Sequence, residues 1–231
     1  MSKLIAIDDG HGMTTAGKRT PFFPGTKRFM HENEFNRAVA DLLKVNLERC
    51  GFDTIMVAPG DSDVPLKTRT DRANKANADF YISIHANAIT GKWGSGASGI
   101  ETFYCEGSTK GKRLAGIVQK HLLQGTKQVN RGIKTASLHV VRETNMPAIL
   151  VEAGFMDDCR EAQLLNCNIF RDECAVDIAK GICEYFDVKY IPEKIVSEKI
   201  YRVQVGAYSD QKNALTVRAR LKSLGYESII V

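Results

Sequence analysis

The sequence predicts an α/β protein: a doubly wound, mostly parallel sheet flanked by helices, followed by a small C-terminal βαβ fragment. Short runs of aromatic and β-branched residues alternate along the chain with longer segments whose apolar residues recur every three or four positions. With 231 residues, 43% of them hydrophobic, the chain can bury one substantial core and carry an appendage. These two observations together favour this fold class.

Three strands and two helices are expected in the first half of the chain. In the stretch Phe80–Asn87 the third strand is expected to end at His85, with residues 86–88 leaving the sheet as a loop. Only Ser83 is polar before His85, so we expect this strand to be buried on both faces. A long helix with apolar residues at helical spacings follows an aperiodic loop at residues 13–30 and ends at Cys50-Gly51. The other expected elements are strands at residues 4–8 and 54–57 and a short helix at residues 69–78.

Further strand-like runs and two helices are expected in the second half. The runs are at residues 99–105, 138–141 and 148–151, and the helices are at residues 109–123 and 172–186. A glycine-rich loop at residues 91–99 leads into the first of these runs. Strands and helices thus continue to alternate, as the doubly wound class requires.

The composition changes after the last of these helices. Residues 188–199 contain Pro192 and several charges with little apolar pattern, which is typical of a linker. The tail then predicts a strand at residues 201–208, a helix at about residues 209–224 and a strand at residues 228–231. This tail is too small to bury a core alone, so we expect one large domain at residues 1–187 and a fragment at residues 200–231.

Charge and cysteine usage exclude several classes of function. The net charge of +5 is too diffuse to predict a nucleic-acid partner, since no basic run is interleaved with aromatic residues. None of the six cysteines forms a Cys-x-x-Cys pair, which favours reduced thiols over a disulfide framework or a cysteine zinc site.

Met1-Ser2-Lys3 runs straight into a strand, and no apolar segment is long enough for a signal peptide or a membrane span. We therefore expect synthesis in the cytoplasm without membrane insertion; the oligomeric state stays open.

Two histidines and a glutamate are predicted to meet at the carboxyl edge of the sheet. His11 follows the first strand between two glycines, His85 lies at the end of the third strand, and Glu32 begins the long helix. Ligands of open α/β sheets bind at this edge, and two imidazoles with one carboxylate are a ligand set for catalytic zinc. Ordinary roles stay open: His11 as a turn cap, Glu32 as a complement to the helix dipole, and His31 as a rival ligand.

Glu152 is the candidate proton carrier. It directly follows the apolar run at residues 148–151, where burying a carboxylate without a role would cost free energy. A salt bridge to Arg142 is the alternative. Of the remaining histidines, His121 is expected on a helix surface, whereas His139 lies in a strand-like run and stays a candidate.

Several short motifs occur in a fixed order over about residues 3–187. They are Asp8-x-Gly10-His11-Gly12, Glu32-x-x-x-Asn36, Arg69 with Asn74, Ser83-Ile84-His85-Ala86-Asn87, Gly99-Ile100-Glu101, and Pro147-Ala148-Ile149-Leu150-Val151-Glu152-x-Gly154-Phe155. Together they resemble the zinc-dependent N-acetylmuramoyl-L-alanine amidases of the amidase-3 type. Arg131-Gly132 and residues 137–143 look most like the branch that includes cell-wall lysis amidases of spore-forming bacilli and phage endolysins. Asp9 departs from the family, which usually has proline at that position.

The resemblance implies a hydrolase that cleaves the amide between the lactyl group of N-acetylmuramic acid and L-alanine of the peptidoglycan stem peptide. It also implies that His11, Glu32 and His85 bind one Zn²⁺ per chain and that Glu152 is the catalytic base. Glu32 is preferred to Glu34 because the family's glutamate lies four residues before its asparagine. The candidate substrate-binding residues are Arg69, Asn74, Asn87 and His139. The alternatives are a stem-peptide endopeptidase or carboxypeptidase and a non-catalytic wall-binding module.

The tail resembles the first half of a sporulation-related repeat (SPOR) domain. The resemblance rests on Tyr201-Arg202-Val203-Gln204-Val205-Gly206-Ala207-Tyr208, with Ala214, Leu221 and Gly225-Tyr226. Such domains bind the glycan strands of peptidoglycan, and the usual second half of the pattern does not follow in this sequence. Peptidoglycan is therefore the expected partner, reached after release through phage holin pores or by lysis of the mother cell.

Overall fold

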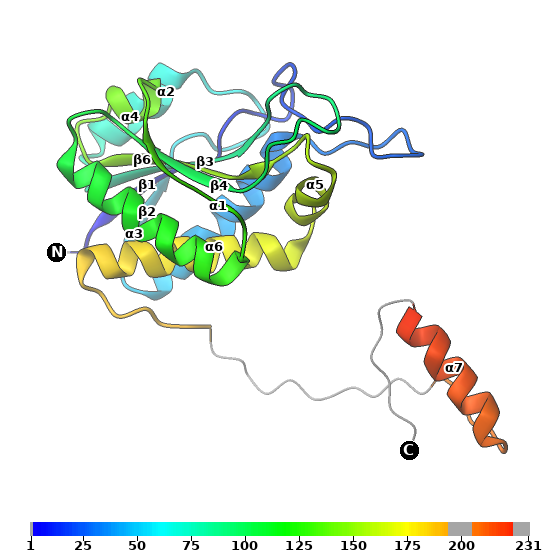
Figure 1. Cartoon of the computed structure of the whole chain (residues 1–231). Coiled ribbons are helices and arrows are strands. Elements are labelled where there is room, and N and C mark those ends of the chain that lie inside the picture. Colours follow the sequence, from blue (N-terminus) through cyan, green and yellow to red (C-terminus); the bar gives the residue numbers. More distant parts are fainter. Residues whose placement is uncertain (1, 194–204, 224–231) are drawn as a thin grey trace. The chain divides into compact units, whose positions relative to one another are not determined.

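The computed structural model describes residues 2–193 and 205–223, and the chain divides into two compact units, residues 1–193 and 194–231 (Figure 1). The first unit contains a six-stranded sheet of order β2-β1-β3-β6-β4-β5. Its strands are β1 (Leu4–Asp8), β2 (Asp53–Met56), β3 (Phe80–Asn87), β4 (Ile100–Tyr104), β5 (Asn130–Thr135) and β6 (Ala148–Phe155). β1, β2, β3 and β6 are parallel, β4 is antiparallel to β6, and β5 is parallel to β4. The predicted mostly parallel α/β sheet is therefore confirmed.

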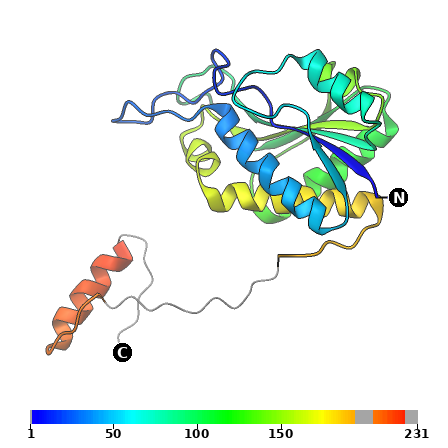
Figure 2. The ribbon, with the colours of Figure 1, turned by 180° about the vertical axis from the view of Figure 1, so that it is seen from behind.

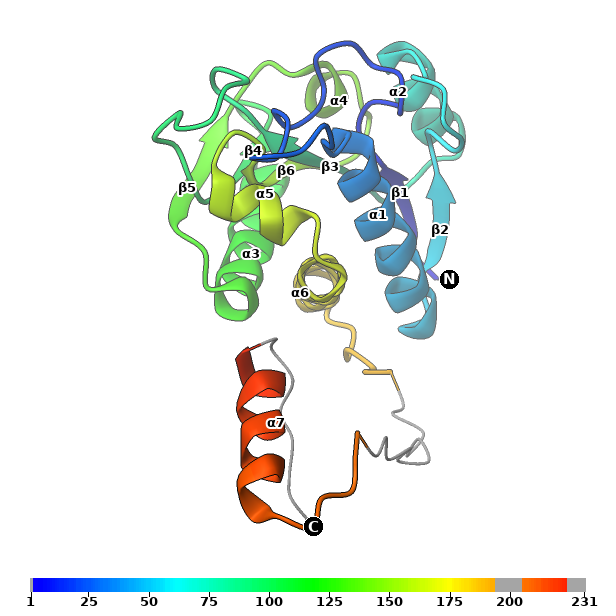
Figure 3. The ribbon, with the colours of Figure 1, turned by 90° about the vertical axis from the view of Figure 1, so that its right-hand side faces the viewer.

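Helices cover both faces of this sheet. They are α1 (Glu32–Arg49), α2 (Leu66–Lys75), α3 (Thr109–Thr126), α4 (His139–Arg142), α5 (Cys159–Leu165) and α6 (Asn168–Phe186). Figure 2 shows α1 and α6 running along one face, and Figure 3 shows α3 beside them, with α2 and α4 over the opposite face. The site lies at the carboxyl edge of the sheet, where the start of α1 meets the ends of β1 and β3.

Side-chain alternation along β3 explains the two cores. Phe80, Ile82 and Ile84 are fully buried in the core shared with α1, α3 and α6. Tyr81 belongs to the smaller core on the side of α2 and α4. Because successive side chains of a strand face opposite sides of the sheet, His85 shares the face of Tyr81.

Two elements of the first unit differ from the sequence prediction. Residues 138–141, predicted to be strand-like, contain α4, whose Val140 and Val141 are buried in the smaller core. A four-residue apolar run cannot distinguish a buried strand from a buried helical turn. The sequence also does not predict β5, because Ile133 is its only large apolar residue, a composition that suits the edge of a sheet.

Two strands are longer than predicted, so two site residues lie inside strands instead of at their ends. β3 continues beyond His85 to Asn87, and β6 continues beyond Glu152 to Phe155. Both side chains therefore project from within paired strands rather than from loops. Strand pairing fixes the backbone of these residues more firmly than a loop would.

The second unit contains α7 (Gln211–Ser223), in agreement with the helix predicted at about residues 209–224. Residues 205–208, predicted as the end of a strand, are not in a strand. The rest of that predicted strand and the strand predicted at residues 228–231 lie outside the described residues. Within the described parts of the chain, no helix has the length and apolar character needed to cross a membrane.

Candidate active site

β1 leads directly into the turn that carries His11. The turn holds His11 at a φ of 60°, in the left-handed region. A Cβ on Gly10 would lie 2.5 Å from Cε1 of His85 and 2.6 Å from a backbone oxygen of β3, so only glycine lets the turn pass this close. The side-chain amide of Asn33 holds the turn by donating to two of its carbonyl oxygens, at 2.6 and 3.0 Å.

The first turn of α1 presents Glu32 to the two histidines. Glu34 accepts the backbone N–H of His31 at 2.7 Å, and the His31 ring packs edge-on against Phe29 with 4.9 Å between ring centroids. His31 and Glu34 are thus engaged in local contacts at the start of the helix. Glu32 is thus the carboxylate that faces the site.

His11, Glu32 and His85 come together, with one potential ligand atom of each within 4.8 Å of the others. Oε1 of Glu32 lies 2.9 Å from Nδ1 of His85 and accepts the N–H of Ala86 at 3.2 Å. Oε2 lies 3.5 Å from Nε2 of His11, is buried, and has no hydrogen-bond partner among the described residues. A buried carboxylate oxygen without a partner is costly unless a cation compensates it, so this donor set fits a metal ion.

A hydrogen-bond chain orients the ring of His85. Its Nε2 lies 3.1 Å from Oγ of Ser83, which donates to Oδ2 of Asp8 at 2.7 Å. A hydrogen on Nε2 would satisfy this chain, and Nδ1, which lies at hydrogen-bond distance from Oε1 of Glu32, is the ring nitrogen that would bind an ion after losing its proton. Partners of this kind set the orientation of metal-binding histidines.

The electrostatics of the cluster favour an anionic Glu32 beside an uncharged His11. Burial lowers the pKa of His11 to about 4. Burial would raise the pKa of Glu32, but its hydrogen bond to His85 and the positive charge that His85 can carry outweigh burial and lower that pKa. Burial likewise disfavours a charge on His85, whose hydrogen bond to Glu32 outweighs burial and raises its pKa. A metal ion binds a carboxylate and a neutral imidazole, and a bound cation would displace the proton from His85.

Glu152 lies beside this cluster, directly opposite His85 in the parallel pair of β3 and β6. Its Oε2 is buried and has no hydrogen-bond partner among the described residues. Burial, helped by the negative charge of Glu32, raises the pKa of Glu152 to about 8. The alternative salt bridge is wrong, because Arg142 pairs with its neighbour Glu143 at 2.7 Å.

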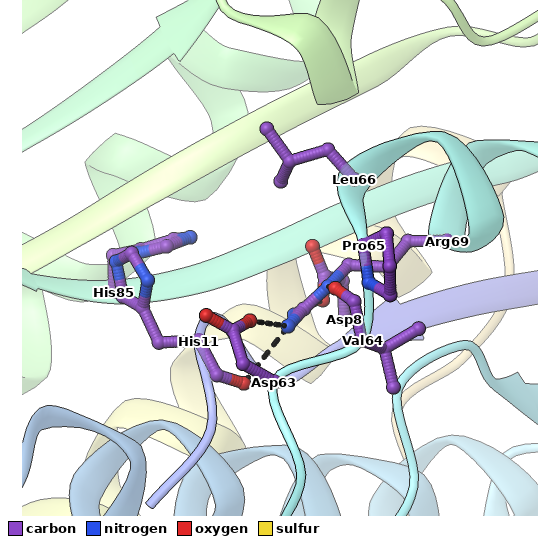
Figure 4. Close-up of a pocket in the computed structure, with 8 residues that line it drawn as sticks. All are labelled: Asp8, His11, Asp63, Val64, Pro65, Leu66, Arg69 and His85. Carbon is purple, nitrogen blue, oxygen red and sulfur yellow. Dashed lines mark hydrogen bonds and ion pairs between the residues drawn. The ribbon is translucent and has the colours of Figure 1, made fainter. Parts of the chain in front are cut away.

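Arg69 supports the turn of His11 from beneath. The buried guanidinium donates to Oδ1 of Asp8 at 2.6 Å and to the carbonyl oxygen of His11 at 2.9 Å. Asp63 accepts a third hydrogen bond at 2.9 Å. Arg69 therefore joins the end of β1 to α2, and only its edge reaches the adjacent pocket (Figure 4).

The other three candidate substrate-binding residues lie in different places. Asn74 joins α2 to the segment after α4, with its amide donating to the carbonyl oxygen of Glu143 at 2.9 Å. His139 lies 3.3 Å from Oγ1 of Thr70, so it also belongs to the contact of α2 with α4. Asn87 lines a pocket together with Glu152. Asn87 is thus the one of these three residues placed beside the proposed proton carrier.

Two pockets flank the cluster. The first, of about 290 Å³, has the histidine rings on one side and Val64, Pro65 and Leu66 on the other (Figure 4). The second, of about 190 Å³, is lined by Ala16, Gly17, Lys18, Glu32, Ala86, Asn87, Ala88, Glu152 and Met156. A substrate that spans the cluster can therefore place a group on each side of it.

Sequence reasoning missed Lys18 and assigned no role to Glu101. Nζ of Lys18 lies 4.0 Å from Oε2 of Glu32, although Lys18 belongs to a loop whose sequence has no periodicity. Glu101 lies directly opposite Glu152 in the antiparallel pair of β4 and β6. The Gly-Ile-Glu motif marked Glu101, but only the register of the two strands places it beside Glu152.

A family model described as N-acetylmuramoyl-L-alanine amidase matches residues 5–184. The chain belongs to this amidase family. A second model, described as the SPOR domain, matches residues 188–231. The amidase match includes all four site residues and every strand of the sheet apart from Leu4 of β1, whereas the SPOR match covers the tail that contains α7.

The amidase relatives include bacterial and phage proteins. The chain is 30% identical to a sporulation-specific N-acetylmuramoyl-L-alanine amidase of Bacillus subtilis over 98% of this chain and 84% of the relative. It is 32% identical to an endolysin of Bacillus phage SPP1 over 82% of this chain and 68% of the relative. The crystal structure of an N-acetylmuramoyl-L-alanine amidase from Clostridium difficile 630 is similar at a TM-score of 0.72 and 32% identity, over 80% of this chain and 97% of that one.

Proposed function

We propose that the chain is a zinc-dependent peptidoglycan hydrolase that cleaves the amide between the lactyl group of N-acetylmuramic acid and L-alanine of the stem peptide. Membership of the amidase family supports the reaction class. The observation that supports the zinc assignment is the meeting of Glu32 with His11 and His85, in which the buried Oε2 of Glu32 has no hydrogen-bond partner among the described residues. Two imidazoles and one carboxylate leave a coordination position open, as a catalytic rather than a structural zinc site requires.

His11, Glu32 and His85 would hold the ion, which when bound lowers the pKa of water and polarises the carbonyl oxygen of the scissile amide. Within the protein, Asp8 and Ser83 keep the His85 ring in its ligand tautomer. The donor set contains no cysteine thiolate. It therefore resembles catalytic rather than structural zinc sites.

Glu152 moves the proton in this mechanism. Its carboxylate accepts a proton from the attacking water and then donates it to the nitrogen of the departing alanine. The burial that raises its pKa to about 8 makes Glu152 hold a proton well, and the positive charge of a loaded cluster lowers that pKa towards neutrality. A group that titrates near the working pH can both accept and donate.

The tail is proposed to bind glycan strands of the same substrate. The SPOR model matches residues 188–231, which include the proposed wall-binding segment at residues 200–231 and the proposed linker at residues 188–199. A binding segment tethered to the catalytic domain, proposed at residues 1–187, would raise the local concentration of substrate. Binding of the tail to denuded glycan strands, measured by co-sedimentation, tests this assignment independently of catalysis.

Digestion of purified peptidoglycan with and without a zinc chelator tests the main proposal. New L-alanine amino groups without new reducing sugars, lost on chelation and restored by Zn²⁺, are the expected result. New amino groups on other residues would instead indicate a stem-peptide endopeptidase. Wall binding without any new end group would indicate a non-catalytic module.

A further inference from the structure

Two cations surround a buried carboxylate next to Glu152. Oε2 of Glu101 accepts hydrogen bonds from Nε of Arg131, at 2.7 Å, and from Nζ of Lys134. Burial alone would raise the pKa of Glu101, but these two hydrogen bonds outweigh it and lower that pKa. Glu101 is therefore ionised, and the group formed by Glu101, Arg131 and Lys134 carries a net charge of plus one.

A bulge in β5 aims Arg131 at this position. Ile100 pairs with Asn130 and Thr102 pairs with Ile133, so Arg131 and Gly132 together lie opposite the single residue Glu101. Gly132 has a φ of +80°, in the left-handed region that glycine adopts without strain. Bulges of this kind redirect side chains near functional sites.

Arg131 is held in place but keeps donors available. Its guanidinium stacks over the ring of Phe155 at 4.7 Å, and only Nε is used for Glu101. Among the described residues, neither Nη atom of Arg131 makes a hydrogen bond. The side chains of Arg131 and Lys134 are 29% and 39% exposed. A planar fork with two free Nη donors matches a carboxylate.

The proposed mechanism fixes the direction of the substrate relative to this group. Glu152 protonates the nitrogen of the departing alanine, so the stem peptide lies on the Glu152 side of the cluster. β4 and β5 follow β6 on that side of the sheet. The first pocket is lined by the carboxylates of Asp8 and Asp63, and its one guanidinium, that of Arg69, already donates to both of them, so this pocket is a poorer site for an anion.

The spacing limits which residues of the stem peptide can reach Arg131. Neighbouring strands are about 4.8 Å apart, so a guanidinium that reaches from β5 back to Glu101 on β4 lies roughly 5 to 10 Å from Glu152. An extended peptide covers about 3.5 Å per residue. This distance corresponds to about one to three residues beyond L-alanine, so the residue that directly follows L-alanine is the first whose free carboxylate can reach Arg131.

We propose that Arg131 and Lys134 bind the free carboxylate of the second stem-peptide residue, the one after L-alanine. This inference rests on the proposed function and adds the direction of the peptide and a preference for an anionic stem. Arg131 supplies a bidentate contact through its Nη atoms, and Lys134 adds a point charge. Glu101 holds both cations in position.

Two soluble muramoyl tripeptides that differ only at the second residue test the proposal. One carries D-isoglutamate, with a free carboxylate, and the other D-isoglutamine, with a carboxamide. The wild-type zinc enzyme is expected to show a kcat/KM at least about tenfold higher for the carboxylate, because a charge-assisted hydrogen bond is lost with the amide. In Arg131→Gln this ratio is expected to fall close to one, in Lys134→Gln to an intermediate value, and in Arg131→Lys to recover in part.

Arg113→Gln provides the matched control, because Arg113 stacks on Tyr185 away from the site. Its selectivity ratio is expected to equal that of the wild type. Calorimetric titration of both tripeptides into the zinc-loaded Glu152→Gln variant, with and without Arg131→Gln, gives the same comparison without turnover.

The outcomes separate the two proposals. A wild type that cleaves both tripeptides equally, or an Arg131→Gln variant that keeps the full preference, overturns the carboxylate subsite and leaves the amidase function standing. A zinc-loaded wild type that releases L-alanine amines from neither tripeptide nor peptidoglycan overturns the proposed function, and the subsite with it.

Discussion

Glu152 of β6 and His85 of β3 lie directly opposite each other in register, which places the proposed proton carrier beside a proposed metal ligand. Both residues are inside paired strands, so the sheet itself sets their separation. Strand pairing of this kind holds a catalytic group more precisely than a loop does.

The first prediction concerns proton transfer by Glu152. Glu152→Gln is expected to lower kcat at least about 100-fold, because a carboxamide of nearly the same shape cannot carry the proton. The zinc content of the purified variant should match that of the wild type. Release of L-alanine amino groups and metal analysis measure the two quantities. Glu143→Gln, at an exposed carboxylate paired with Arg142, is the control, and a Glu152→Gln enzyme with full turnover would remove Glu152 from the mechanism.

The second prediction concerns the link between metal and stability. Because Oε2 of Glu32 is buried and has no hydrogen-bond partner among the described residues, Zn²⁺ is expected to bind the folded chain and to stabilise it by about 2.7 kcal/mol at 100 times its dissociation constant. For a domain of this size that corresponds to a rise in Tm of roughly 5 to 10 °C. Thermal unfolding with zinc and with a chelator measures the difference. His11→Asn should abolish the response and His121→Asn, at a surface histidine paired with Glu184, should keep it; equal responses would argue against the cluster as the zinc site.

The sequence predicted that His11, Glu32 and His85 meet because these residues follow a rule of sheet topology. His11 and His85 come from neighbouring parallel strands, whose carboxyl ends meet at one edge. Glu32 begins the helix that follows β1, so it starts near the same edge. The order of strands and helices places these residues at one edge of the sheet, and the pattern of apolar runs is enough to predict that order.

The parts that the sequence did not predict depend on tertiary contacts. β5 is polar and pairs only at the edge of the sheet, so no alternation marks it. His139 was assigned to a strand-like run, yet α4 forms because Val140 and Val141 pack against the core residues of β6. The pairing of Glu101 with Glu152 follows from the antiparallel register of β4, which local sequence does not encode.

The third prediction concerns the buried ion pair of Arg69 and Asp8. Both side chains are 1% exposed and their charged atoms are 2.6 Å apart. Arg69→Met leaves Asp8 buried without its counter-charge, so the free energy of unfolding should fall by about 3 to 5 kcal/mol. Urea denaturation measures this loss. Lys67→Met, which breaks an exposed pair with Asp71 on the same helix, should cost at most about 1 kcal/mol. Similar losses in the two variants would show that the buried pair of Arg69 and Asp8 contributes no more to the free energy of unfolding than an exposed pair does.

The fourth prediction concerns the close approach of Gly10 to His85. A Cβ at Gly10 would lie 2.5 Å from Cε1 of His85, so Gly10→Ala must displace the ring. Zinc affinity, measured by competition with a coloured chelator, should fall about tenfold or more. Gly116→Ala on α3, where a Cβ meets nothing within 4 Å, should bind zinc as the wild type does. Unchanged affinity in Gly10→Ala would mean that the ring position does not govern binding.

The fifth prediction concerns the pH dependence of stability through Asp157, which anchors the glycine-rich loop. Oδ2 of Asp157 accepts the backbone N–H groups of Ile89 and Thr90, each at 2.8 Å, and of Gly91 at 3.2 Å. Burial would raise the pKa of Asp157, but these hydrogen bonds and that of Ser95 outweigh burial and lower the pKa below its usual 3.8. The unfolded chain therefore takes up this proton at a higher pH than the folded chain does.

The stability that Asp157 contributes is consequently complete above about pH 4 and is lost as the pH falls through the lower folded-state pKa. Asp157→Asn should reduce the free energy of unfolding at neutral pH by about 1 to 3 kcal/mol, because a carboxamide cannot accept from all of these donors. Its stability should then decline less steeply than that of the wild type on acidification below pH 4. Urea denaturation at a series of pH values measures both slopes, with Asp71→Asn as the control at an exposed carboxylate. Parallel slopes for the wild type and Asp157→Asn would show that the acid sensitivity of the fold comes from other carboxylates.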